Sequence, residues 1–299
     1  MIYSQKYQFE FGYCTNFDLE TEDLLLDKYQ ILDYDVEDIT AQTQLSKAEV
    51  RQNYVYVTIQ LPEYDKASQK FVIKDLHCFV SPKWLLIIDR NDSKHFRQFI
   101  TFQERILSDE EVLDPFIIFY ELLDYCVTKA YKAIFRFKSD IANLESDLFR
   151  FENDLDVVKD ILIIKKDLIN FESSIEPLGD MILDLENKSA KFHPESKDRL
   201  DSTLDIVKKI LNNLKNFKEQ MNLLGETNDA LMTRSTNHFL RLFTVASLLV
   251  AIPNIWTSFF GMNVFFGFPD NYLPLICVIL AILITLICII KYLKIKKWL

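Results

Sequence analysis

Residues Phe239–Phe260 read FLRLFTVASLLVAIPNIWTSFF, and Arg241 is the only charged residue among them. A second apolar run, Tyr272–Ile290, reads YLPLICVILAILITLICII and carries no charge at all. The hydrocarbon core of a bilayer is about 30 Å thick, and a helix of roughly 20 apolar residues crosses it. Because both runs reach that length, they predict two transmembrane helices, at about 239–260 and 272–290, rather than a buried helix pair of a soluble protein.

Basic residues flank the two runs on one side of the predicted membrane. Arg234 precedes the first run. Four lysines follow the second run: Lys291, Lys294, Lys296 and Lys297. The connecting loop, 261–271, is short and holds a single charge. Because lysine and arginine concentrate in cytoplasmic flanks, we predict a multi-pass protein of the cell membrane whose large N-terminal part and C-terminus are cytoplasmic.

The 299-residue chain has a formal charge of −10, which is distributed unevenly. Residues 234–299 contain six basic residues and one acid, a net of +5, which leaves −15 for residues 1–233. An acidic chain binds nucleic acid poorly, so we expect no nucleic-acid partner. The five glycines form neither a Gly-x-Gly-x-x-Gly motif nor a P-loop, and the four histidines lack zinc-site spacing. We therefore expect no enzymatic activity and no organic cofactor.

The chain divides into three regions by composition. Residues 1–115 hold segments rich in β-branched and aromatic residues, which predict strands. These segments are Lys6–Thr15, Asn53–Leu61, Lys70–Ser81 and Lys83–Asp89. With helical segments such as Lys94–Leu107 between or beside them, they predict a mixed α/β domain whose strand order the sequence does not fix. Long helices are predicted for 116–233, and the transmembrane region for 234–299.

A helical pattern fills 116–233, and Pro177 with Gly179 is predicted to interrupt it. The last helix is predicted to begin near Pro194 and to run into the first span, about 67 residues or roughly 100 Å. Its apolar residues form a heptad-like seam: Leu200, Leu204, Val207, Leu211, Leu214, Phe217, Met221 and Leu224. Since a helix of that length requires partners, copies of itself are the simplest ones.

Polar or small residues follow one another along the first predicted span. Their spacing is close to a 3.5-residue repeat: Asn237, Thr244, Ser247, Ala251, Asn254, Ser258 and Gly261. Such a repeat turns a narrow stripe toward the axis of a left-handed helix bundle. Two interpretations stay open, a hydrated pore lined by several copies, or close packing of helices through small residues. An amide such as Asn254 is costly in mid-membrane unless it faces a partner or water.

The chemistry of such a pore is limited because neither span contains Asp or Glu. A proton relay is therefore disfavoured, and ion selection would use amide, hydroxyl and backbone oxygens. Mg²⁺ gives up its water reluctantly. A ring of amide oxygens therefore suits a hydrated divalent cation that is recognised through its water shell.

Residues Phe260–Val264 read FGMNV at the outer end of the first span. A Gly-Met-Asn tripeptide that closes the first of two terminal spans, after a long helix and before a lysine-rich terminus, resembles the signature of the CorA family of magnesium transporters. The final KIKKWL, Lys294–Leu299, is similar to the basic tail of family members. The resemblance implies an α+β cytosolic domain followed by long helices and two C-terminal transmembrane helices. It also implies assembly into a homopentameric, funnel-shaped channel surrounded by membrane lipid.

The resemblance also implies roles for individual residues. Gly261, Met262 and Asn263 would form the selectivity filter, and Asp270 in the outer loop would attract cations. The pore-lining residues would be Asn237, Leu240, Thr244, Ser247, Ala251, Asn254 and Ser258. Leu240 and Ala251 fall on gate positions where methionine is frequent in the family. Mg²⁺ would be both transported and regulatory, bound inside the cell by acids of the long helix near Asp201 and Asp205.

Three functions stay open. The first is a Mg²⁺ channel or transporter that admits divalent cations and closes when cytosolic Mg²⁺ is high. The second is a Zn²⁺, Co²⁺ or Ni²⁺ transporter on the same scaffold, which the motif does not distinguish. The third is a membrane-anchored scaffold or signalling protein, although an anchor has no use for Asn254 or Asn263.

Overall fold

The structure, a computed structural model, describes residues 2–4, 9–15, 17–41, 45–106, 114–150, 155–189, 196–261 and 273–295. The chain divides into two compact units. The first comprises Met1–Asp147 and Asp156–Gly225, and the second comprises Leu148–Leu155 and Glu226–Leu299. The two units are taken in turn below.

A six-stranded sheet forms the centre of the first unit, in the order β1-β2-β6-β5-β4-β3. The strands are β1 (Ile2–Ser4), β2 (Glu10–Cys14), β3 (Lys47–Val50), β4 (Val55–Asp65), β5 (Lys70–Ser81) and β6 (Trp84–Ile88). Neighbouring strands are antiparallel except β2 and β6, which pair in parallel. The predicted strand at Lys70–Ser81 is confirmed with the same bounds. The short strands β1 and β3 were not predicted.

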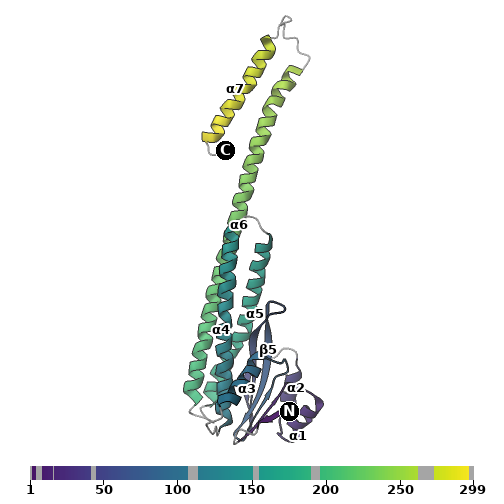
Figure 1. Cartoon of the computed structure of the whole chain (residues 1–299), viewed down its shortest axis with the longest axis vertical. Helices are drawn as coiled ribbons and strands as arrows, with labels where there is room; N and C mark the ends of the chain where they lie inside the picture. Colours follow the sequence, from purple (N-terminus) through teal and green to yellow (C-terminus); the bar gives the residue numbers. More distant parts are fainter. Residues whose placement is uncertain are drawn as a thin grey trace. The chain divides into compact units, whose positions relative to one another are not determined.

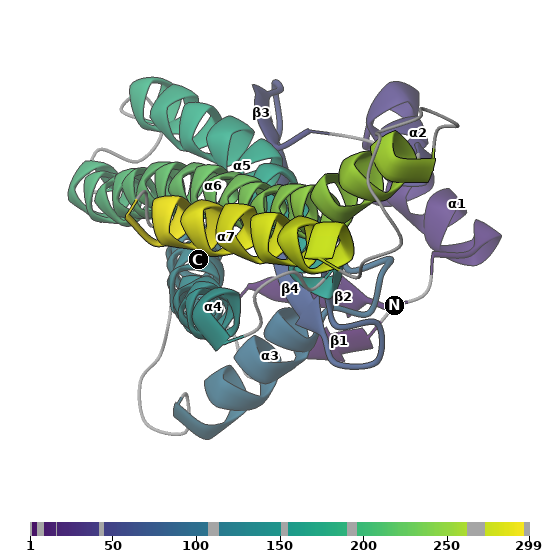
Figure 2. The same ribbon diagram turned by 90° about the horizontal axis from the view of Figure 1, so that it is seen from above.

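Helices cover both faces of this sheet. On one face lie α1 (Leu19–Asp27) and α2 (Asp33–Thr40), and on the other lie α3 (Lys94–Ile106) and the long helix α4 (Pro115–Arg150), as Figure 2 shows. A hydrophobic cluster joins α1 and α2 to the sheet through Leu25, Ile39, Tyr56, Phe79 and Leu86. Side chains of both orientations along β5 are buried, Cys78 as well as Phe79. Near the start of β5 the Phe71 ring lies 4.8 Å from that of Phe137 on α4. The sheet is thus buried on both sides.

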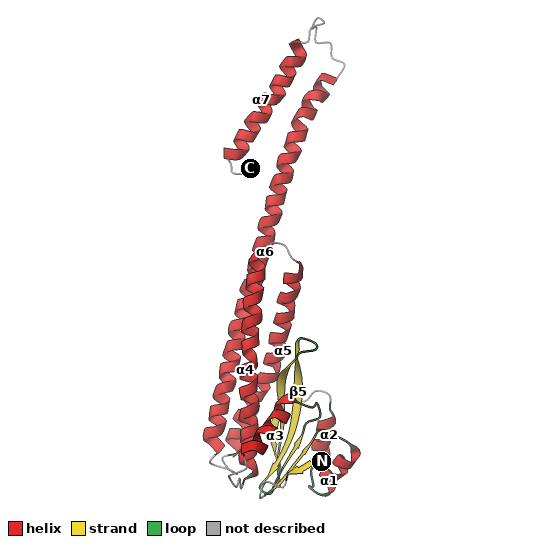
Figure 3. Ribbon diagram, viewed as in Figure 1, coloured by secondary structure: helices red, strands yellow, loops and turns green. Residues whose placement is uncertain are grey.

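Three long helices complete the first unit: α4, α5 (Leu155–Ser189) and the first part of α6 (Lys197–Gly261), which lie side by side (Figures 1 and 3). The Phe137 ring of α4 lies 5.6 Å from Phe171 of α5 and 6.5 Å from Phe217 of α6. Six of the eight predicted seam side chains of α6 are buried: Leu200, Leu204, Val207, Leu214, Phe217 and Met221. Leu211 and Leu224 are only partly buried, and Ile210, which the seam did not include, is buried. The expectation that copies of α6 cover this seam is wrong here, because α4 and α5 of the same chain cover it.

The helix α5 runs without interruption through Pro177 and Gly179, which corrects the predicted break. Pro177 cannot donate a hydrogen bond to the carbonyl four residues earlier. The buried side chains of Ile175, Leu178 and Met181 hold the helix in the bundle on both sides of the proline. Gly179 allows α6 to approach closely, since a Cβ atom placed there would lie 3.1 Å from Val207 Cγ1.

The second unit contains the remainder of α6 and α7 (Leu273–Ile295). Within the described residues, α6 is the helix whose length and composition allow it to cross a membrane. At 23 residues α7 is about 35 Å long, and its first charged residue is Lys291. Most apolar side chains of this unit are exposed, Phe239, Phe243 and Val250 among them. Lipid or further protein must cover them.

Gly179→Val should lower the free energy of unfolding by about 1–3 kcal/mol, because the added side chain overfills the contact with Val207. Gly225→Val is the matched control, since a Cβ there meets only Lys165 Nζ at 3.8 Å. Both substitutions change helix propensity equally, so the difference between the unfolding free energies of the two variants reports packing alone. Urea unfolding of the purified chain in detergent measures these free energies. Equal unfolding free energies for the two variants would contradict a close α5–α6 contact at Gly179.

Candidate functional site

The candidate pore face lies on α6. All seven predicted pore-lining side chains are exposed in the single chain: Asn237, Leu240, Thr244, Ser247, Ala251, Asn254 and Ser258. A separate face of the same segment is covered, because Val245 is buried and Leu249, Ile252 and Trp256 are partly buried. These four follow one another at steps of four, three and four residues, which is the spacing of one helix face. The covered face therefore leaves the polar stripe open.

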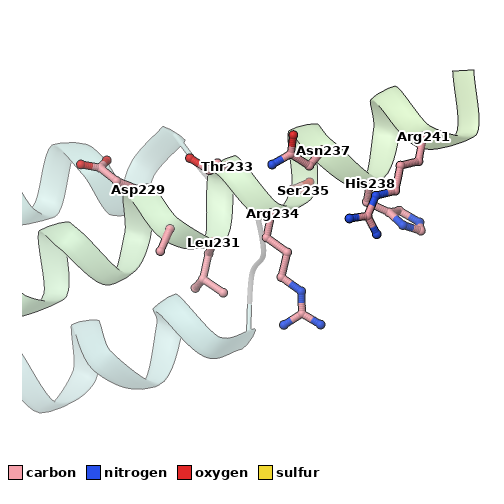
Figure 4. A pocket seen from close by; sticks show the side chains of 9 residues that line it. Asp229, Leu231, Thr233, Arg234, Ser235, Asn237, His238 and Arg241 are labelled. Atoms are coloured by element: carbon pink, nitrogen blue, oxygen red, sulfur yellow. The ribbon is translucent and has the colours of Figure 1, made fainter. Parts of the chain in front are cut away.

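Figure 4 shows where the stripe begins on α6. Asp229, Thr233 and Asn237 lie along one side of the helix, Arg234 is directed away from Asp229 and Thr233, and His238 and Arg241 lie side by side further along. Asp229 and Thr233 precede Asn237 by two turns and one turn, so they extend the polar row beyond the predicted set. The four-residue spacing was the sequence signal that would have found them.

Two hydroxyl groups of the stripe are held by the helix backbone. Thr244 Oγ1 donates to the Leu240 carbonyl at 2.7 Å, and Ser247 Oγ donates to the Phe243 carbonyl at 2.9 Å. A hydroxyl has one hydrogen and two acceptor lone pairs. Because the hydrogen is used within the helix, each of these side chains offers only acceptor sites outward. Water bound to a cation points its hydrogens outward, so such a surface can accept hydrogen bonds from a hydrated cation.

The predicted selectivity filter lies only partly within the described residues. Gly261 is the last residue of α6. Met262, Asn263 and Asp270 lie outside the described residues, and their roles stay predictions from the sequence.

The two candidate sensor acids, Asp201 and Asp205, are exposed on α6. Asp205 Oδ1 accepts a hydrogen bond from Lys208 Nζ at 3.4 Å. Within the ranges that the structure describes, no three His, Cys, Asp or Glu side chains are grouped to hold a metal ion. Within those ranges, Asp201 and Asp205 are therefore not part of an assembled metal site.

An acid-lined hollow of about 230 Å³ lies within the first unit, between α4 and α5 beside the β4–β5 hairpin. Four aspartates line it. Asp140 and Asp147 lie seven residues apart on α4, and Asp160 and Asp167 lie seven residues apart on α5. Burial raises the pKa of Asp140 and of Asp167, and the charge of Asp140 raises the pKa of Asp167 further. Arg136 lies over the Tyr64 ring, 3.4 Å from its centroid, and supplies the positive charge of this hollow. The sequence analysis did not identify this cluster, although the seven-residue spacing signalled it.

A buried polar cluster holds the start of α3. The Glu63 carboxylate accepts the Ser93 hydroxyl and the backbone N–H of His95, the latter at 2.9 Å. Asp89 Oδ2 accepts the Ser93 N–H at 2.7 Å. Asp89 Oδ1 is buried and has no hydrogen-bond partner in the described part of the chain. Burial raises the pKa of Asp89 to about 6. This cluster caps a helix and has no opening to solvent at Asp89, which is fully buried.

An α+β unit whose last helix continues into exposed apolar residues with a polar stripe is an arrangement that suits a membrane transport protein. A profile described as "CorA-like Mg2+ transporter protein" matches residues 12–297. The chain therefore belongs to the CorA-like Mg²⁺ transporter family, as the Gly261-Met262-Asn263 motif predicted. Members of this family are membrane-located transporters or channels of divalent cations and not enzymes. Among curated proteins, none matches this chain significantly.

Solved structures share the fold. The complete CorA magnesium transporter from Methanocaldococcus jannaschii is 16% identical, covers 100% of this chain and 94% of its own, and superposes with a TM-score of 0.84. Full-length CmaX is 12% identical over 96% and 88% of the two chains, with a TM-score of 0.79. The cytoplasmic domain of ZntB from Vibrio parahaemolyticus RIMD 2210633 is 10% identical over 77% and 88%, with a TM-score of 0.62. The predicted α+β domain with a long helix is thus confirmed.

The buried carboxyl of Asp89 should make stability depend on pH. Its ordinary pKa is 3.8, whereas the folded chain raises it to about 6. Asp89 therefore favours the folded state fully below about pH 4, and this contribution is lost as pH rises to about 6. Asp89→Asn carries no ionisable group, so its stability should not fall as pH rises past 6. Its free energy of unfolding at pH 8 should exceed that of the unmodified chain by about 2–3 kcal/mol.

Urea unfolding at pH 4.5 and pH 8 measures this difference. Asp23→Asn, at an exposed position of α1, is the matched control and should leave the pH dependence unchanged. If Asp89→Asn has the same pH dependence as the unmodified chain, the carboxyl is not protonated in the folded state.

Proposed function

We propose that this chain is a magnesium channel in which five copies of α6 surround a hydrated path, closed when cytosolic Mg²⁺ is high. The carrying observation is the exposure of the whole stripe from Asn237 to Ser258 in the single chain. Side-chain amides such as Asn254 are costly in contact with lipid. A ring of copies that encloses water removes this cost.

The neutral lining favours Mg²⁺ with its water retained. Between Asn237 and Gly261 the described helix offers amide and hydroxyl oxygens but no carboxylate. These oxygens cannot replace a Mg²⁺ hydration shell, but they can accept hydrogen bonds from it. Thr244 and Ser247 are already restricted to accepting by their backbone bonds. In this proposal Gly261, Met262 and Asn263 form the outer filter, Asp270 attracts cations, and Leu240 with Ala251 sets the width of the gate.

Transport of Zn²⁺, Co²⁺ or Ni²⁺ is the competing proposal. The likeness to the ZntB cytoplasmic domain favours it, since that protein has the same fold as the first unit. Zn²⁺ sites use sulfur, imidazole and carboxylate ligands. From Asn237 to Ser258 the stripe has none of these side chains, and this chemistry favours Mg²⁺.

Regulation by internal Mg²⁺ is proposed to act through Asp201 and Asp205. Residues 1–233 carry −15 per copy, so neighbouring copies repel one another unless cations lie between them. Both acids are exposed on α6, where a second copy can supply the remaining ligands. In this proposal the N-terminal part and the C-terminus are cytoplasmic.

Asn254→Leu should reduce Mg²⁺ flux at least about tenfold, because every copy loses a hydrogen-bonding group worth about 1 kcal/mol. Flux of Mg²⁺, Co²⁺ and Zn²⁺ into liposomes containing the purified chain measures this effect and ranks the ions. Thr257→Val is the matched control, since Thr257 is exposed on α6 but lies off the stripe. Unchanged flux in Asn254→Leu would exclude the stripe as the pore. Faster flux of Zn²⁺ than of Mg²⁺ would favour the competing proposal.

Asp201→Asn combined with Asp205→Asn should raise the internal Mg²⁺ concentration that halves the flux by at least about fivefold, the lower range of an allosteric coupling. Flux into liposomes preloaded with increasing Mg²⁺ measures this concentration. Glu145→Gln combined with Glu219→Gln removes the same charge from exposed positions of α4 and α6. This control should change the half-inhibiting Mg²⁺ concentration little. Equal shifts in both double variants would indicate general repulsion between copies rather than a site at Asp201 and Asp205.

A further inference from the structure

Four polar side chains gather on one face of the sheet, where β4 and β5 pair. Tyr56 and Thr58 belong to β4, and Asp75 and His77 belong to β5. Residues two apart lie on the same side of a strand, and Thr58 lies directly opposite His77 in the register. Because Tyr56 belongs to the hydrophobic cluster beneath α1 and α2, all four side chains are on the face that those helices cover.

A chain of hydrogen bonds links three of these groups. His77 Nε2 lies 3.3 Å from Asp75 Oδ2, and His77 Nδ1 lies 2.9 Å from the hydroxyl oxygen of Tyr56. An ionised carboxylate can only accept a hydrogen bond, so Nε2 must carry the hydrogen of the neutral ring. Nδ1 is then the acceptor, and the Tyr56 hydroxyl donates to it.

The hydrogen-bond chain runs from the protein surface into the core. The Asp75 side chain retains 19% exposure, whereas His77, Tyr56 and Thr58 are fully buried. Burial opposes the ionisation of Asp75, but the hydrogen bond from His77 outweighs it, and the pKa of Asp75 is lowered. The imidazole therefore lies beside a negative charge in a place that water does not reach.

Thr58 stands at the inner end of this chain without a hydrogen bond of its own. Its Oγ1 atom is buried and has no partner in the described part of the chain. Burial raises the pKa of Tyr56, and the nearby Thr58 hydroxyl acts against that rise. A hydroxyl oxygen has two acceptor lone pairs. Thr58 Oγ1 is thus a free acceptor close to the one hydrogen that the Tyr56 hydroxyl can redirect.

The charged groups of the neighbouring elements are already engaged. Lys47 pairs with Asp38 and with Glu49. Arg51 pairs with Asp35. The carboxylate that contacts the imidazole is therefore the one of the cluster itself. The other charges that act on the cluster are those of Asp35 and Asp38 of α2, Lys47 and Glu49 of β3, and Arg90.

We propose that these four side chains form a proton-binding site, in which His77 takes up one proton at Nδ1 and its hydrogen bond with Tyr56 reverses. The new N–H bond forms with a proton from bulk water. Nδ1–H then donates to the Tyr56 oxygen, Nε2–H still donates to Asp75, and the Tyr56 hydrogen turns to Thr58 Oγ1. Every group keeps a partner in the charged form, and Thr58 gains the one that it lacks. The inference concerns the first unit and does not depend on which ion is transported.

Solid-state NMR of the full chain in liposomes, with histidine labelled by nitrogen-15, reports which ring nitrogens carry a hydrogen. His95→Gln, His193→Gln and His238→Gln, made one at a time, assign the other three histidines and leave the signal of His77. At high pH we expect a hydrogen on Nε2 and none on Nδ1. On acidification both nitrogens should carry one before the chain unfolds. A neutral ring with its hydrogen on Nδ1, or a ring that stays neutral until unfolding, would overturn the proposal.

Two variants test the partners of the charged form. Asp75→Asn removes the facing charge and should lower the proton affinity of His77 at least about tenfold, the lower end of the effect of an opposite charge in contact. Thr58→Val removes the acceptor of the Tyr56 hydrogen only when His77 is charged. It should lower the same affinity at least about fivefold, the equivalent of about 1 kcal/mol for a buried hydroxyl left unsatisfied.

Two controls separate these effects from packing and general charge. Thr58→Ser keeps the hydroxyl and should retain the proton affinity of His77. Asp23→Asn removes one charge from an exposed position of α1 and should also leave that affinity unchanged. An unchanged affinity in Thr58→Val would refute the reversal of the hydrogen bond, and an unchanged affinity in Asp75→Asn would refute the site. If Thr58→Val does not fold, Asp75→Asn and the protonation pattern of the unmodified chain decide.

Discussion

The structure depends on α6 remaining one helix over the 65 residues from Lys197 to Gly261. In proteins most of the stability of a helix comes from tertiary packing rather than from intrinsic helix propensity. Each part of α6 therefore needs other groups packed against it. In the first unit α4 and α5 cover the seam, and each fully buried apolar side chain there contributes roughly 1.5–3 kcal/mol. In the second unit the same helix exposes Phe239, Phe243 and Val250. One element thus carries two kinds of surface, each suited to a different solvent.

The sequence predicted those features that depend on long, regular patterns. The bounds of β5 follow from a run of β-branched and aromatic residues. The length of α6 and the separation of a polar from an apolar face on its last part follow from residue periodicity. The Gly261-Met262-Asn263 motif then identified the family, which periodicity alone could not do. These features are repeated many times along the chain, so a single exceptional residue does not hide them.

Other features depend on contacts between distant residues, which a single sequence does not contain. The strand β3 (Lys47–Val50) alternates charged and apolar residues over only four positions, and its pairing with β4 defines it. Pro177 breaks isolated helices, but buried neighbours on both sides keep α5 intact. The seam of α6 predicted a partner correctly but not its identity, because α4 and α5 offer the same apolar chemistry as another copy of α6. Whether Asp201 and Asp205 meet further ligands likewise depends on a second chain.

The hydroxyl groups of Thr244 and Ser247 have a consequence for leakage of protons. Protons move along a file of water and hydroxyl groups by hopping, and each hydroxyl must rotate and release its own hydrogen to pass one on. In this helix both hydrogens are held by backbone carbonyls, at Leu240 and Phe243. A water-filled path along this face of α6 could therefore conduct hydrated cations while these side chains take no part in a proton wire. Proton hopping past these two side chains would then depend on water alone.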